Sequence, residues 1–336
     1  MITFPPLLPI KVRRRWVIED TPVTVCVAAI CESDRVICAS DRMFTAGDIQ
    51  FEPPQTKHVY LTKSITVMLA GDATFATEIM LKVQGVVQKR VEDDPAKWWT
   101  LQEVVDLYRK FFNECRNRRA EQRILSPLGL DINSFATMQS VMAAHLVTQI
   151  ATELISFEPP EIELIFAGND PSGVHIYVAD GGNITCRDTA GFAAIGAGYW
   201  HANSQFMFAR HARSKSLPET LLLTFFAKKR AEVAPGVGKF TDMFSIGPEL
   251  GSFILIGSHV LEKLTKVYES EQKSYDKATE KAKKSIETYV KELTDAATAA
   301  AAKDDQKQTA NTNGREASPG PKELPEPSVE EEKSKT

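Results

Sequence analysis

Two charged side chains, Asp41 and Lys57, stand where apolar segments end and begin, close to small residues and glycines. Asp41 directly follows the apolar segment VICAS, and Lys57 directly precedes the segment HVYL. Thr45 and Gly47 lie in the stretch between them. A carboxylate and an ammonium group that leave neighbouring strands can share one space, where each favours the charged form of the other. The pattern therefore predicts a polar site at the edges of strands.

The segments around these residues have the composition of paired β-strands. TVCVAAIC and VICAS are apolar and rich in β-branched residues, and the polar residues 32–35 between them are typical of a tight turn. The segments HVYL and SITVML follow as two further strands. The second runs into Ala70, Gly71 and Asp72, where a helix is predicted to begin. A hairpin and two strands are thus expected to position the polar residues.

The order and spacing of these residues resembles that of the β-type subunits of the proteasome and the related bacterial ring protease HslV, which are N-terminal-nucleophile (Ntn) hydrolases. In that family an Asp follows the second strand, a Thr-x-Gly comes soon after, a Lys stands at the next strand, and an Ala-Gly heads the first helix. The same order holds here, without a gap, for Asp41, Thr45, Gly47, Lys57, Ala70 and Gly71. The resemblance covers about residues 20–258 and implies an α+β fold, a four-layer αββα sandwich of the proteasome-subunit type.

The resemblance implies that Thr24, at the start of the first strand, is the nucleophile. A threonine hydroxyl attacks an amide only when a base takes its proton. A free α-amino group, with a pKa of roughly 7.7 to 8.0, can be that base if the threonine is the first residue of the mature chain. Lys57 would keep the amine deprotonated, Asp41 would hold Lys57 in place, and the backbone N–H of Gly71 would serve as oxyanion donor.

The resemblance also implies where a substrate would lie. Thr45 and Gly47 would form the edge that pairs with an extended peptide. The specificity pocket would be lined by Phe44, Gln55, Val59, Leu69 and Ala73. The predicted function is cleavage of peptide or amide bonds by a threonine-type peptidase in a homo-oligomeric ring. An ATP-dependent unfoldase is a further partner in this interpretation, and no cofactor or metal is expected.

Departures from the family pattern leave the position of the nucleophile open. The interval from Thr24 to Asp41 is one residue longer than in the family, so an alignment without a gap puts Val25 in the nucleophile's place. An insertion in the turn at residues 33–35 would instead leave Thr24 in position. Val23 stands where self-processing members have a glycine, whose freedom from a Cβ permits the strained backbone that cleavage requires.

Two further departures concern residues that surround the nucleophile in the family. Residues 196–198 read Gly-Ala-Gly where the family has Gly-Ser-Gly, and the region 234–239 lacks the family's Asp-x-x-Ser-Gly-Gly run. These differences favour an alternative, a catalytically inactive structural or scaffold subunit of a proteasome-like ring. An amidase that acts on a small molecule is a third hypothesis, because a fold alone does not fix a substrate.

Length and composition bound the class of protein. The 336 residues, 43% of them hydrophobic, can bury one sizeable domain, and a net charge of −4 predicts neither a nucleic-acid nor a membrane partner. No apolar run approaches the length of about 18 residues that spans a membrane. The basic cluster at 13–15 follows a short apolar run broken by prolines, the reverse of a secretory signal. With the five cysteines interpreted as buried thiols, these features predict a cytoplasmic protein.

The chain divides into four predicted parts. Residues 1–23 form an N-terminal arm or propeptide, and residues 24–258 form the proteasome-like domain, with an inserted loop and helix at about 120–157. Residues 259–302, rich in Lys, Glu and Ala, are expected to form a charged helix. Residues 303–336 contain prolines and charged residues without an aromatic side chain, a composition that predicts a disordered tail.

Four helices and a β-meander are predicted inside the domain, besides the inserted helix. Apolar residues recur at helical spacing from Asp72 to about Glu92 and again from near Thr100. The alternating segments IELIFAGND, VHIYVAD and NITCRD, separated by turn residues, indicate the meander. A strand followed by a helix is expected from FAAIGAGYWHANSQF. A fourth helix is expected to begin at Ser216, with Glu219 three residues on as a capping box, and FTDMFSIGP and SFILIGS are the closing strands.

Overall fold

The computed structural model describes residues 24–46, 49–53 and 56–312. The predicted arm or propeptide at 1–23, the segment 313–336 of the predicted tail, and the predicted site residues Gly47 and Gln55 lie outside the described residues. The chain divides into two compact units, the first ending at Tyr268 and the second beginning at Glu269.

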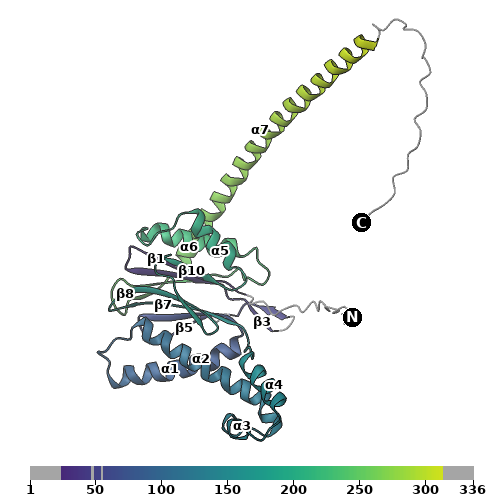
Figure 1. Ribbon diagram of the computed structural model, residues 1–336. Helices are drawn as coiled ribbons and strands as arrows, with labels where there is room; N and C mark the ends of the chain where they lie inside the picture. The colour runs from purple at the N-terminus through teal and green to yellow at the C-terminus, as the bar shows by residue number, and fades with distance from the viewer. Residues whose placement is uncertain (1–23, 47–48, 54–55, 313–336) are drawn as a thin grey trace, which may run out of the picture. The chain divides into compact units, whose positions relative to one another are not determined.

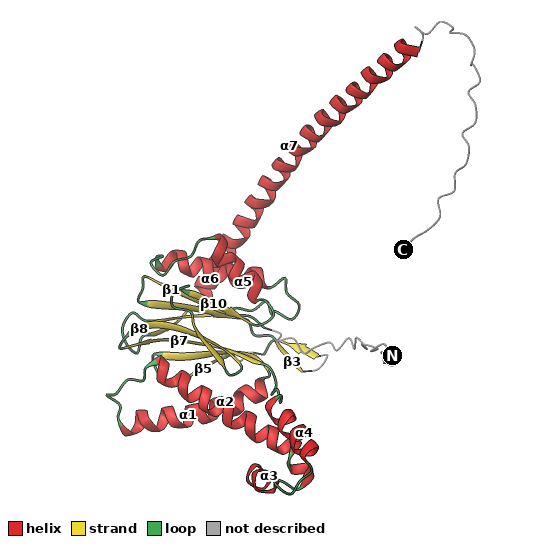
Figure 2. Cartoon of the chain, viewed as in Figure 1, coloured by secondary structure: helices red, strands yellow, loops and turns green. Residues whose placement is uncertain are grey.

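The first unit is built from four layers, two sheets stacked face to face with helices on both outer faces (Figures 1 and 2). Helices α1 (Ala73–Asp93) and α2 (Leu101–Ile124) cover one sheet. Helices α5 (Tyr199–Phe208) and α6 (Leu217–Ala231) cover the other. The prediction of a mixed α+β domain is therefore confirmed.

Both main sheets are antiparallel and have five strands. The first contains, in spatial order, β10 (Phe192–Ile195), β1 (Cys26–Cys31), β2 (Arg35–Ser40), β11 (Asp242–Ile246) and β12 (Phe253–Leu255). The second contains β5 (His58–Tyr60), β6 (Ile65–Gly71), β7 (Ile162–Asp170), β8 (Gly173–Asp180) and β9 (Asn183–Cys186). A separate hairpin, which the sequence did not indicate, consists of β3 (Phe44–Ala46) and β4 (Ile49–Phe51).

Burial on both faces explains why β1 is a continuous apolar run. Alternate residues of a strand point to opposite faces, so Cys26, Ala28 and Ile30 pack against the second sheet. Val27 and Ala29 pack against α5 and α6. A strand that is covered on both sides gains from apolar residues at every position, and all six residues of β1 are buried.

Three helices begin at capping residues close to the starts that the sequence predicted. Asp72 caps α1, its carboxylate accepting the N–H of Phe75 at 2.6 Å. Thr100 caps α2 in a capping box with Glu103, and Ser216 caps α6 in a capping box with Glu219. Side-chain oxygens at these positions satisfy N–H groups that have no partner inside the helix.

The insertion contains more structure than the predicted loop and single helix. After α2 a short 3₁₀ helix, η1 (Ser126–Leu128), leads to α3 (Ile132–Met138) and α4 (Ala144–Ile155). These elements have a small core of their own around Leu125, Phe135 and Ile150. The short helix α3 was missed, although Asp131 and Ser134 form a capping box at its start.

The final helix is longer than predicted. Helix α7 extends over Ser258–Thr312, so the first ten residues of the predicted disordered tail are helical. Within the first unit, the start of α7 packs on α6 through Leu264, which is 8% exposed.

The prediction that all five cysteines are buried is wrong for one of them. The side chain of Cys186 is exposed, whereas the other four cysteines are buried. In the described part of the chain, no helix is both long and apolar enough to cross a membrane.

Candidate active site at the strand ends

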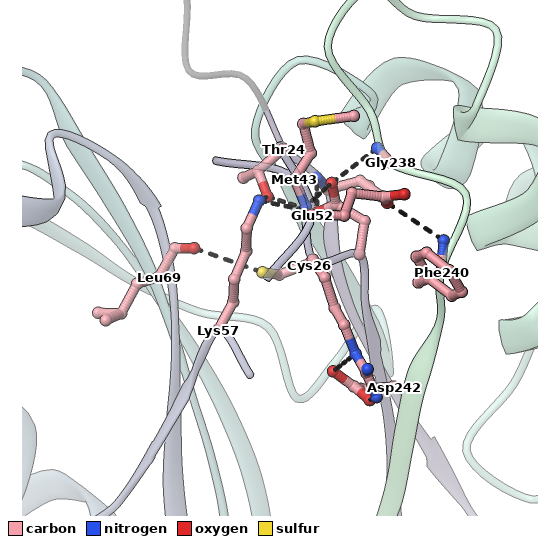
Figure 3. Close-up of polar contacts among 12 residues, drawn as sticks. Thr24, Cys26, Met43, Glu52, Lys57, Leu69, Gly238, Phe240 and Asp242 are labelled. Atoms are coloured by element: carbon pink, nitrogen blue, oxygen red, sulfur yellow. Dashed lines mark hydrogen bonds and ion pairs between the residues drawn. The ribbon is translucent and has the colours of Figure 1, made fainter. Parts of the chain in front are cut away.

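Thr24, Asp41 and Lys57 come together where strands of the two sheets end. Figure 3 shows Thr24 and Lys57 at this edge. Antiparallel pairing sets Cys26 of β1 opposite Ser40 of β2, so Thr24 before β1 lies beside Asp41 after β2. Lys57 precedes β5 in the other sheet. Its Nζ donates to Thr24 Oγ1 and, at 3.0 Å, to Asp41 Oδ1. The predicted strand-edge site is therefore assembled from both sheets.

The Asp41 carboxylate is surrounded by donors and fully buried. Oδ1 accepts the hydroxyl of Thr24 at 2.5 Å and the N–H of Val25 at 3.1 Å, in addition to Lys57. Oδ2 accepts the N–H of Met43 at 3.1 Å and the N–H of Gly238 at 2.8 Å. Three backbone N–H groups thus fix the orientation of the carboxylate.

Lys57 is a buried cation, 7% exposed, held by its backbone as well as its side chain. Its carbonyl accepts the N–H of Leu69 at 3.1 Å, which ties the start of β5 to β6. Its Nζ also lies 5.4 Å from the ring centroid of Phe44, within the range of a cation–π contact. The ammonium group is therefore held against the hydroxyl of Thr24, which is itself 2% exposed.

One backbone turn, at residues 196–198, closes around Thr24. The N–H of Gly198 donates to the Thr24 carbonyl at 3.4 Å. Gly196 has a φ of +83°, and a Cβ at this position would come within 2.4 Å of the Thr24 carbonyl oxygen. The N–H of Gly196 donates to the carboxylate of Glu163 at 2.7 Å, and burial raises the pKa of Glu163. Ala197, in the same turn, supplies no hydroxyl.

A buried thiol links the sheets next to this cluster. Cys26 Sγ donates to the carbonyl of Leu69 at 3.6 Å, from β1 to β6. Burial raises the pKa of the Cys26 thiol, so it remains protonated and packs as a small apolar group. It supplies neither a nucleophile nor a ligand in this environment.

The predicted oxyanion donor, Gly71, is the last residue of β6 and does not stand at the start of a helix. Helix α1 begins at Ala73, with Asp72 as its cap. The N–H of Asp72 donates to the backbone carbonyl of Glu161, just before β7, at 2.9 Å. Because successive N–H groups along a strand point to opposite neighbours, the N–H of Gly71 faces the β5 side of the sheet. This is the side on which Lys57 stands.

The residues predicted to bind substrate are distributed around this edge. Val59 and Leu69 are half-buried and pack against the core beneath α1 and α2. Phe44 is half-buried, and Ala73 is exposed at the first position of α1. Thr45 lies in β3, where its backbone pairs with Gln50 of β4.

Gly238 and Glu163 belong to the site but were not predicted. Gly238 contacts Asp41 through its backbone N–H, a group that nearly every residue carries. The residue type therefore does not indicate this contact, and the only indication in the sequence is the glycine-rich run 235–238. Glu163 stands between the apolar residues Ile162 and Leu164 in the strand IELIFAGND, which is the pattern that could have indicated it.

No protein-family model matches this chain, and no curated protein matches it. The fold and the site together define an α+β protein of two stacked antiparallel sheets between helical layers, with a buried Thr–Asp–Lys cluster at the strand ends.

Proposed function

We propose that the chain is an Ntn hydrolase of the proteasome type, which cleaves peptide or amide bonds with Thr24 as nucleophile. The observation that carries the proposal is the contact of the Thr24 hydroxyl with both Lys57 Nζ and Asp41 Oδ1 in a buried cluster. The stacked sheets between two helical layers, with the cluster at their strand ends, agree with the αββα sandwich that the sequence resemblance implies.

The same contacts favour Thr24 over Val25 as the nucleophile. Val25 meets Asp41 through its backbone alone, its N–H donating to the carboxylate and its carbonyl accepting the backbone N–H of Asp41. The side chain of Val25 packs in the apolar core against α5 and α6. A hydroxyl is needed at this position, and Thr24 provides it. The alignment with an insertion in the turn at residues 33–35 is therefore the one that we adopt.

In the proposed mechanism, cleavage after Val23 frees the α-amino group of Thr24. The amine takes the proton from Oγ1, and the oxygen attacks the carbonyl carbon of the amide. The substrate C–N bond breaks as the proton passes to the leaving amine, and an ester on Thr24 remains. Water then hydrolyses the ester and restores the hydroxyl. The Lys57 ammonium stabilises negative charge on Oγ1, and Asp41 holds Lys57 in place.

A ring of identical subunits, with an unfoldase as partner, is part of the same proposal. Size-exclusion chromatography with light scattering tests the assembly. A multiple of the chain mass of 37.3 kDa, or of the shorter mature chain, is expected, and a clean monomer would contradict the ring.

A second candidate is an inactive structural subunit in which the cluster serves stability alone. Two observations favour it. Ala197 offers no hydroxyl beside the turn that closes on Thr24, and the side chain of Thr24 is 2% exposed. In that case Asp41 and Lys57 form a buried pair without a catalytic role.

Hydrolysis of a panel of fluorogenic peptides separates these candidates. The wild-type protein is expected to release the fluorophore, and Thr24→Ala is expected to abolish release because the attacking oxygen is gone. Thr224→Ala is the matched control. Thr224 is also fully buried, and its hydroxyl has no hydrogen-bond partner in the described structure. Equal non-zero rates for the wild type and Thr24→Ala would rule out Thr24 as the nucleophile. No hydrolysis by a chain that begins at Thr24 would favour the structural subunit.

A further inference from the structure

Helix α6 contains a lysine whose side chain is completely buried. Lys228 is 0% exposed, and burial lowers its pKa. A buried ammonium group is stable only when acceptors surround it. Lys228 Nζ has three: Glu232 Oε1 at 2.6 Å, the carbonyl of Gly238 at 2.8 Å and the carbonyl of Lys239 at 3.1 Å.

Two of these acceptors belong to the loop that reaches the candidate active site. Gly238 makes two backbone hydrogen bonds. Its carbonyl accepts from Lys228 Nζ, and its N–H donates to Asp41 Oδ2, each at 2.8 Å. A side chain at this position would displace the carboxylate of Glu52. A Cβ on Gly238 would lie 1.9 Å from Glu52 Oε1 and 3.1 Å from Asp41 Oδ2. The loop is therefore held close to the carboxylate by polar contacts.

We propose that Lys228 is a positioning residue for the active site, which aims the N–H of Gly238 at Asp41 by binding the carbonyl of the same residue. The effect on turnover rests on the proposed function, but the effect on the loop does not. Contacts then run from Lys228 through Gly238 to Asp41, and from Asp41 to Thr24 and Lys57.

The neighbouring lysine provides a matched control. Lys229 Nζ also binds Glu232, with both oxygens at 2.8 Å, but it contacts neither of the loop carbonyls. Lys229→Met therefore removes a charge and a bond to Glu232 without releasing the loop. Lys228→Met removes the same charge and the same kind of bond and also leaves the carbonyls of Gly238 and Lys239 without their donor.

The test compares these two variants by amide hydrogen exchange and by steady-state kinetics. In Lys228→Met the amide of Gly238 is expected to exchange about tenfold to hundredfold faster than in the wild type, as for the loss of one or two buried hydrogen bonds. The kcat is expected to fall about tenfold with little change in KM. Lys229→Met should change none of these quantities.

Each result decides between the claims. If Gly238 exchanges at the same rate in both variants, Lys228 does not hold the loop and the inference is wrong. If the exchange rate of Gly238 rises in Lys228→Met but neither the wild type nor this variant hydrolyses peptides, the proposed function fails while the positioning contact stands. If Lys228→Met does not fold, Lys228→Leu, which also lacks a donor, takes its place. An exchange rate at Gly238 for Lys228→Leu equal to that of Lys229→Met would then overturn the inference.

Discussion

At the scale of single residues, the buried pair of Asp41 and Lys57 dominates the site. Its charges are 3.0 Å apart, and both side chains are almost free of solvent contact. Removing charges from water is costly, so breaking such a pair by removing one partner is strongly destabilising. The two partners differ, however, in how many other groups depend on them. Asp41 also satisfies three backbone N–H groups, from Val25, Met43 and Gly238.

Asp41→Ala is therefore expected to cost more stability than Lys57→Met. The first change leaves a buried ammonium without its counter-charge and three backbone N–H groups without their acceptor, with a loss of about 3–5 kcal/mol in the free energy of unfolding. The second leaves a carboxylate that keeps its backbone donors, so the loss is smaller. Urea unfolding measures both. Asp106→Ala, which breaks an exposed ion pair with Arg109, is the control and should cost less than about 1 kcal/mol. An equal or larger loss for Lys57→Met would contradict the expectation.

A second prediction at this scale concerns His175, which lies outside the candidate site. The hydrogen bond with Asp188, at 2.6 Å, raises the pKa of His175 above its ordinary value. A raised pKa in the folded state means that protonation stabilises the fold. That stability is fully present below the unfolded pKa of about 6.5 and is lost as the pH rises through the folded pKa.

The measurement is the difference in free energy of unfolding between the wild type and His175→Gln as a function of pH. The difference is expected to be largest at about pH 5.5 and to decrease above pH 6.5 until it levels off. Other histidines cancel in this comparison because both proteins contain them. A difference that is constant with pH, or that grows as the pH rises, would show that the Asp188 contact does not stabilise the imidazolium.

At the scale of elements, the site depends on how closely the turn between β10 and α5 approaches the start of β1. Gly196 makes this approach, and its backbone has a φ of +83°. Two separate costs arise when a side chain is added here. One is the left-handed conformation, and the other is the collision with the carbonyl of Thr24, 2.4 Å from the position of the Cβ.

Gly196→Ala is expected to lower the thermal unfolding midpoint clearly more than Gly129→Ala does. Gly129 also has a positive φ, of +71°, but a Cβ there meets nothing within 4 Å, so the control carries the conformational cost of about 1 kcal/mol alone. The collision at Gly196 adds to that cost and displaces Thr24, so peptide hydrolysis should also fall. Similar midpoints for the two variants would mean that the turn can move away from Thr24 freely.

Features that depend on residues close together in the sequence could be predicted, and features that depend on distant residues could not. The hairpin β1–β2 and the caps at Asp72, Thr100 and Ser216 were predictable because each depends on residues a few positions apart. The hairpin β3–β4 was missed, since three-residue strands are too short to show a period. The contact from Gly238 to Asp41 joins residues 197 positions apart through a backbone N–H, so no property of either side chain predicts it.

The candidate site was predictable in part. Asp41 and Lys57 were predicted to share a space because charged residues at strand ends are conspicuous in an apolar sequence. The sequence alone does not choose between Thr24 and Val25, because the two differ by a single residue in register. The contact of the Thr24 hydroxyl with Asp41 is what supports our proposal of Thr24. The burial of Lys228 could not be expected from the run Lys228-Lys229-Arg230, which is typical of an exposed helix end.

At the scale of the whole molecule, the first unit is complete by Tyr268. Leu264 on the first turns of α7 packs over Phe226 and its neighbours on α6, whereas large apolar residues of the second unit, such as Ile286 and Leu293, are exposed. The first unit therefore has its own core.

Two truncations test this division. Deletion of residues 269–336 is expected to change the thermal unfolding midpoint by less than about 2 °C. Deletion of residues 258–336 is expected to lower it by about 5 °C or more, because the apolar face of α6 loses its cover. Scanning calorimetry measures both midpoints. A large loss on the shorter deletion would show that the second unit contributes to the core of the first.

The most direct measurement of the proposed function is N-terminal sequencing of the purified protein together with its intact mass. The mechanism needs a free amine on Thr24, so the account predicts a mature chain that begins at this residue, and the variant Thr24→Ala should keep residues 1–23 if the cleavage is autocatalytic. A chain that is active against peptides while still carrying residues 1–23 would contradict Thr24 as an N-terminal nucleophile. An inactive chain that keeps them would leave the structural subunit as the better account.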